Sequence, residues 1–248
     1  MHRKKTVGRF RPALTSTNNP TVLALTANRL MKLINAARFA GITFLVAGIY
    51  STTVLQPIYR LMIEGQQQQG WLVEVLPRWT IGGWLLLLSI LAWMTLLVTS
   101  MYSYSPVHRV STMMQTGLII IAAVLLILGI LIGLTRMEGL AAGSGGPNPQ
   151  ETTALGVALF DDNAMALLRA GLLMGGAVSA WIGVDLALLG KLPPLWLAPA
   201  IVAGVALVPA PFLGLSAWQL LIALAGFLFF CLVLGARRAL PESYPPLG

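Results

Sequence analysis

The feature that most constrains this chain is a run of 45 residues, 192–236, that contains no Asp, Glu, Lys, Arg or His. The run is interrupted only by Pro209-Ala210-Pro211 and Gly214-Leu215-Ser216. In water, a helix needs polar or charged residues along its solvent-facing side, and the charged ones are absent here. A bilayer instead requires about 20 mainly apolar residues for each helical crossing. The run therefore predicts two membrane-spanning helices joined by a short turn.

The rest of the chain has the same character. Of its 248 residues, 57% are hydrophobic and only 10% are charged, whereas about a quarter of the residues in soluble proteins are charged. These values predict an all-α, polytopic transmembrane helix bundle. Windows with few charges place six spans, at residues 39–59, 79–108, 110–135, 164–189, 195–208 and 217–236. The fifth span is the shortest, and Pro209 with Pro211 ends it.

The distribution of Lys and Arg predicts the orientation of the bundle. With six crossings, both termini lie on one side of the membrane, and 12 of the 16 basic residues fall on that side. Basic residues concentrate in cytoplasmic loops. We therefore expect a multi-pass protein of the cell inner (plasma) membrane with cytoplasmic N and C termini. Residues 1–38 form a basic cytoplasmic tail, 39–236 the six-helix domain, and 237–248 a short second tail.

The basic tail contains a helical pattern over residues 21–38. Leu23, Ala27, Leu30, Ile34 and Ala37 share one face, and polar residues occupy the other. This pattern predicts an amphipathic helix in the headgroup plane. Its candidate contacts with headgroups, including those of anionic lipids, are Arg29, Lys32 and Arg38. Alternatively, the segment is simply the cytoplasmic start of the first span.

Nucleic-acid binding is not expected of this tail, because its basic run is short and no aromatic stacking residues are interleaved with it.

Two loops on the outer side are long enough to hold structure. Residues 71–79 in the first loop are predicted to rest in the membrane interface, because aromatic and apolar residues dominate them. In the second loop, residues 143–149 have the composition of a flexible linker. The last two loops are very short, so spans four, five and six are predicted to pack as an antiparallel trio.

The inventory of reactive side chains argues against an enzyme. The chain has two histidines, His2 and His108, and a single cysteine, Cys231. These residues do not supply a haem ligand pair, a metal-binding cluster or a nucleophile with its base inside the bundle. We predict no catalytic residue, no metal site and no cofactor.

Asp185 is the one ionisable side chain set clearly inside a predicted span, and Gln115 is a second intramembrane polar residue. An intramembrane acid is costly and is a candidate functional site. Its expected partners are Arg38, Arg109, Arg237, Ser111, Thr112 and Gln115. Two interpretations stay open: a structural pairing of helices, or coupling to a proton or ion.

Span four also carries a stripe of small residues at every fourth position. The stripe predicts a helix-packing face made of Gly171, Gly175, Ser179, Gly183 and Ala187. This face packs either against span three or five of the same chain or against another membrane subunit.

Two segments suggest a family. Residues 37–41 (Ala-Arg-Phe-Ala-Gly) enter span one, and residues 190–196 (Gly-Lys-Leu-Pro-Pro-Leu-Trp) link spans four and five. With these segments the layout resembles an uncharacterised bacterial family of six-span integral membrane proteins, known as a domain of unknown function. The resemblance implies a fold and no activity.

These patterns favour a non-catalytic accessory or scaffolding subunit of a larger membrane complex, with other membrane subunits contacted through span four. One alternative is a small transporter or channel that uses Asp185. A second alternative is a membrane-embedded regulator that acts through its basic cytoplasmic tail.

Overall fold

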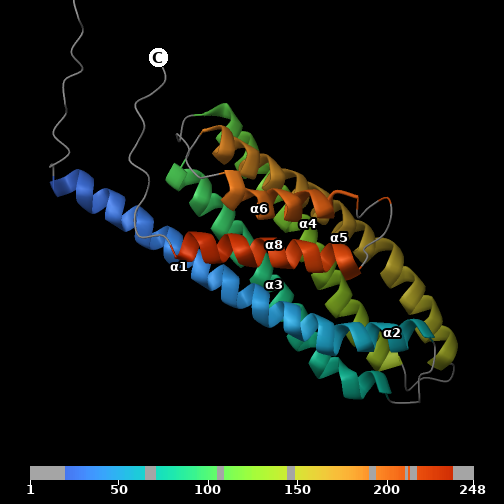
Figure 1. The fold of residues 1–248 in the computed structure, drawn as a ribbon. Helices are drawn as coiled ribbons and strands as arrows, with labels where there is room; N and C mark the ends of the chain where they lie inside the picture. The colour runs from blue at the N-terminus through green and yellow to red at the C-terminus, as the bar shows by residue number, and fades with distance from the viewer. Residues whose placement is uncertain are drawn as a thin grey trace, which may run out of the picture.

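The computed structural model describes residues 20–64, 71–104, 109–143, 149–189, 194–209, 212 and 217–236, and these are helical apart from a few turn residues at helix ends. Figure 1 shows the helices packed as one elongated bundle. The elements are α1 (Pro20–Tyr50), the π-helical turn η1 (Ser51–Leu55), α2 (Gln56–Glu64), α3 (Trp71–Tyr104), α4 (Val110–Gly143), α5 (Pro149–Leu188), α6 (Pro194–Leu207) and α8 (Ala217–Gly235).

Within the described residues, five helices are long and apolar enough to cross a membrane. They are Asn28–Leu61, Trp71–Tyr104, Val110–Gly139, Asn163–Leu188 and Trp218–Gly235. The predicted fifth span corresponds to α6, which has only 14 residues and is therefore about 21 Å long, short of the roughly 30 Å hydrocarbon core. The chain is thus a polytopic membrane protein with five helices long enough to span and one short apolar helix.

The helices form a closed ring in which each one packs on its neighbours in the order α1, α3, α4, α5, α6, α8 and back to α1. Spans four, five and six, which were predicted to pack as a trio, correspond to α5, α6 and α8. Helix α6 packs between α5 and α8. Ring closure between α1 and α8 is antiparallel, since Gly41 lies beside Cys231 and Gly48 beside Leu224. The beginning of α1 and the end of α8 therefore lie at the same end of the bundle, as Figure 1 shows. We call this the terminal end.

The core of the ring is apolar and is drawn from all six of its helices, with Leu33, Trp93, Ile119, Ile182, Leu197 and Phe230 among its buried residues. The outer faces are apolar as well. Trp84, Met113 and Leu232 are exposed, although they are large hydrophobic side chains. Exposed apolar faces of this extent suit a surrounding of lipid, because water would make them an aggregation hazard.

The opposite end of the bundle, which we call the α2 end, has a small core of its own. It is formed by Ile58 of α2, Leu72 and Val75 of α3, and Met137 and Ala141 of α4. Residues 71–79 are the first turns of α3, and Leu72 and Val75 among them are buried in this core. Their position in the membrane interface stays a prediction.

The second outer loop is also more helical than expected. Helix α4 continues to Gly143, and α5 begins at Pro149. The intervening residues of the predicted linker lie outside the described residues. Helix α5 is therefore 40 residues long and rises about 60 Å, twice the hydrocarbon thickness.

The amphipathic segment in the N-terminal region is continuous with the first span. Helix α1 passes through Arg38 without a break, so residues 21–38 are helical as predicted but are not separated from residues 39–50. Within this segment Leu33 and Ala37 are buried in the main core, and Leu30 and Ile34 are half-buried. Arg29, Lys32 and Arg38 are exposed. Their contact with lipid headgroups stays a prediction.

Candidate functional site

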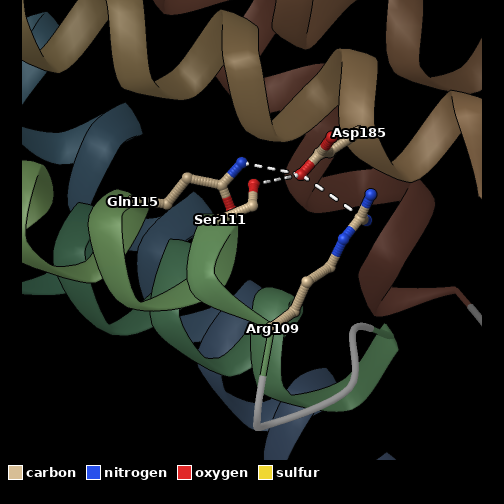
Figure 2. Close-up of polar contacts among 4 residues, drawn as sticks. All are labelled: Arg109, Ser111, Gln115 and Asp185. Atoms are coloured by element: carbon tan, nitrogen blue, oxygen red, sulfur yellow. Dashed lines mark hydrogen bonds and ion pairs between the residues drawn. The ribbon is translucent and has the colours of Figure 1, made fainter.

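The candidate site lies at the terminal end, where the last turns of α5 pack against the first turns of α4. Helix α4 begins directly after Arg109, whose carbonyl accepts hydrogen bonds from the backbone N–H groups of Thr112 and Met113. Ser111 and Gln115 are four residues apart and therefore share one face of α4. This local geometry presents both side chains to Asp185 of α5 (Figure 2).

One oxygen of the Asp185 carboxylate is the focus of the site. The hydroxyl of Ser111 and the side-chain amide of Gln115 each donate a hydrogen bond of 2.9 Å to Asp185 Oδ2. The guanidinium of Arg109 lies 3.9 Å from the same oxygen through Nη1. Figure 2 shows the three side chains, all from the region where α4 begins, converging on the single carboxylate.

The hydrogen bonds hold this site together more strongly than the ion pair does. The Arg109 side chain is 44% exposed and the Asp185 side chain is 16% exposed, and solvent-exposed ion pairs contribute little because water screens them. Gln115, by contrast, is 1% exposed. Because a buried amide donor without an acceptor is costly, the bond from Gln115 to Asp185 ties α4 to α5.

Three of the partners expected for Asp185 are therefore present, namely Arg109, Ser111 and Gln115. Arg38 lies elsewhere, and its side chain packs beside Gly235 at the end of α8. A basic side chain at a helix C-terminus is favourable because it faces the negative end of the helix dipole. Arg237 lies outside the described residues.

The small-residue stripe of α5 lies against other helices of the same chain. Gly171 faces Leu126 of α4, and Gly175 faces Trp93 of α3 and Ala122 of α4. Ser179 accepts a 3.3 Å hydrogen bond from the indole N–H of Trp93 and donates one of 2.7 Å to the carbonyl of Gly175. Further along, Gly183 faces Ile201 of α6, and Ala187 packs partly buried on the main core.

Three glycines that the sequence pattern missed, Gly176, Gly204 and Gly226, lie closest to the backbone of a neighbouring helix. A Cβ built on Gly204 of α6 would lie 2.5 Å from the carbonyl oxygen of Gly176 and 2.7 Å from the backbone N of Ala180, both on α5. One built on Gly226 of α8 would lie 2.4 Å from the carbonyl oxygen of Pro199. The spacing Gly176-x-x-x-Ala180 was a readable signal for close backbone approach, but the neighbouring five-member stripe was the longer pattern.

Replacement of Gly175 by leucine tests the packing of the stripe. We expect it to lower the unfolding temperature measured in mild detergent, because the added side chain meets the Trp93 ring, which already lies 3.4 Å from a Cβ at this position. The oligomeric state should not change, since the contacting side chains belong to the same chain. Loss of a subunit contact at unchanged unfolding temperature would contradict this assignment.

Among the described residues, no group of three or more His, Cys, Asp or Glu side chains is placed to hold a metal ion. The arrangement at Asp185 is that of a hydrogen-bonded carboxylate acceptor between two helices. Comparison of the chain with protein families, with curated proteins and with solved structures finds no match.

Proposed function

We propose that this protein is a six-pass integral membrane subunit, with both termini in the cytoplasm, that acts as a non-catalytic accessory or scaffolding component of a larger membrane complex. Helix α6 is proposed to complete the sixth pass together with the turn that follows it. The membership of the six-span family that residues 37–41 and 190–196 suggest is part of this proposal. The excess of basic residues at the terminal end supports the orientation.

The observation that carries the scaffolding role is the length of the helices at the α2 end. Helices α3 and α4 have 34 residues each, and α5 has 40. They rise about 51 Å and 60 Å, against roughly 30 Å of hydrocarbon. The surplus at this end has its own core, which Ile58 and Met137 help to form. A rigid extension of this kind is suited to contact a neighbouring protein outside the lipid.

The geometry of Asp185 also favours this function over a carrier. Its Oδ2 already accepts hydrogen bonds from two side chains of the same chain, and this use of the carboxylate is structural. We propose that a partner helix contacts α5 on its outward face, where Val184 and Leu188 are 42% and 80% exposed. The small-residue stripe is occupied within the chain, so it does not serve this contact.

The second candidate function is a small carrier or channel. It is supported by the partial exposure of the Asp185 side chain, since a proton or cation can reach a carboxylate in contact with solvent. A regulatory role of the basic tail rests on its sequence alone.

Purification from native membranes in mild detergent tests the proposal. We expect stoichiometric companion subunits, and a cysteine introduced at Leu188 should crosslink to one of them in the membrane. A cysteine at Met113, which is exposed on α4, is the matched control and should not. Both variants are made in a chain in which the native Cys231 is replaced by serine.

The carrier function is tested in liposomes that contain only this chain. We expect no proton or cation flux above the lipid background. A flux that the assembled Asp185→Asn variant loses would overturn the scaffolding proposal in favour of the carrier.

A further inference from the structure

A second charged side chain, Arg169 of α5, lies between the two ends of the bundle. Its position along the bundle axis follows from two contacts between α4 and α5, in which Gly171 lies beside Leu126 and Gly129 lies beside Leu168. Arg169 is therefore level with residues 127–128 of α4, about 12 Å from the level of Arg136. When a 30 Å hydrocarbon core is centred between Arg109 and Arg136, which are about 40 Å apart along α4, Arg169 lies about 7 Å inside it.

Helix α6 does not extend over Arg169. Gly176 lies two turns further along α5 on nearly the same face, since seven residues turn a helix by about 700°. Gly176 packs against Gly204, Leu207 and Val208 at the end of α6. Arg169 is thus about 10 Å beyond the end of α6, towards the α2 end.

The Arg169 side chain has an unused donor. Its Nε is buried, and within the part of the chain that the structure describes it has no hydrogen-bond partner. Buried polar groups are almost always hydrogen-bonded, so an unpartnered one calls for an explanation such as an ion or ligand. Among the described side chains, the acid in an ion pair is Asp185, which pairs with Arg109. Asp185 lies about 24 Å from Arg169 along α5.

We propose that Arg169 binds the phosphodiester of a phospholipid from the leaflet at the α2 end, with the lipid tails alongside α5 beyond the end of α6. A guanidinium matches phosphate geometry through parallel N–H donors. Side chains of a helix lean towards its N-terminus, and the N-terminus of α5 is at the α2 end. The long Arg169 side chain therefore starts out from α5 towards the headgroups of that leaflet and is long enough to extend its guanidinium to them. Leu168 and Leu172, next to Arg169 on α5, pack on the apolar main core. The depth of Arg169 inside the hydrocarbon favours a ligand that has acyl chains over a free anion.

The test compares Arg169→Gln and Arg169→Lys with the matched control Arg136→Gln, an exposed arginine at the same end of the bundle. Native mass spectrometry of the full chain after partial delipidation measures retained phospholipid. Titration with short-chain phosphatidylglycerol measures rebinding, and inorganic phosphate serves as competitor. We expect Arg169→Gln to weaken rebinding at least tenfold, Arg169→Lys to weaken it less because the charge remains, and Arg136→Gln to leave it unchanged.

Equal lipid retention by wild type and Arg169→Gln overturns the proposal, and so does displacement of the lipid by millimolar phosphate, which would make the site one for a free anion. If Arg169→Gln fails to fold, Arg169→Lys tests the proposal instead, because lysine keeps the positive charge and lacks the planar guanidinium with its parallel N–H donors. Rebinding by Arg169→Lys equal to that of wild type then overturns the proposal.

Discussion

Replacement of Gly204 by alanine, a change of one methyl group, is expected to destabilise this protein by about 2–4 kcal/mol. The added carbon would lie 2.5 Å from the carbonyl oxygen of Gly176 and 2.7 Å from the backbone N of Ala180. Both atoms belong to the backbone of α5, so no side-chain rotation relieves the clash and the two helices must separate. Close van der Waals contact of helices is what drives association in a bilayer, and this change removes it along α5 and α6.

The matched control for this prediction is Gly117→Ala on α4, because a Cβ built there meets no atom within 4 Å. Alanine is the better helix former of the two residues, so this variant should be unchanged or slightly more stable. Unfolding in mild detergent with increasing sodium dodecyl sulfate, followed by circular dichroism, measures the difference. Equal stabilities of the two variants would show that α5 and α6 are not in backbone contact.

Replacement of Asp185 by alanine is expected to cost about 2–4 kcal/mol, whereas Asp185→Asn should cost about 1 kcal/mol. Alanine leaves the buried amide of Gln115 and the hydroxyl of Ser111 without their common acceptor. Asparagine keeps one side-chain oxygen that can accept both bonds. It loses the charge opposite Arg109, which contributes little because the guanidinium is 44% exposed.

A double-mutant cycle with Gln115→Leu checks the physical reason. Once leucine has removed the buried donor, Asp185→Ala should cost less than it does in the wild type, because only Ser111 is left unpaired. The same unfolding assay measures all four chains. Additive costs would mean that the hydrogen bond from Gln115 to Asp185 does not contribute to stability.

Much of the helical layout was predictable from the sequence. Helix α8 ends within a residue of the predicted sixth span, and α6 matches the predicted fifth span equally closely. Four of the helices extend beyond the predicted spans, mainly at the α2 end. This extension could not be read from charge-free windows, because helices outside the lipid tolerate charged residues and are held by local packing such as that of Leu72 and Val75.

The candidate site was predictable in part. Asp185 stood out because a charge inside an apolar window is rare, and its partners Ser111 and Gln115 could be named from their level in the membrane. Which of the six possible partners Asp185 contacts depends on how α4 is rotated about its own axis. The hydrophobic pattern of α4 does not indicate this rotation, because the helix is apolar on nearly all of its faces.

By itself, the sequence determined that this is a membrane protein and which apolar segments form its helices, because the transfer of a segment into hydrocarbon depends on the composition of that segment alone. Only the tertiary structure decided that α1 closes the ring against α8, that Gly204 rather than the longer stripe marks the backbone contact of α5 with α6, and that Arg169 lies beyond the end of α6. These features depend on the relative rotation and register of several helices, which packing sets for all of them at once.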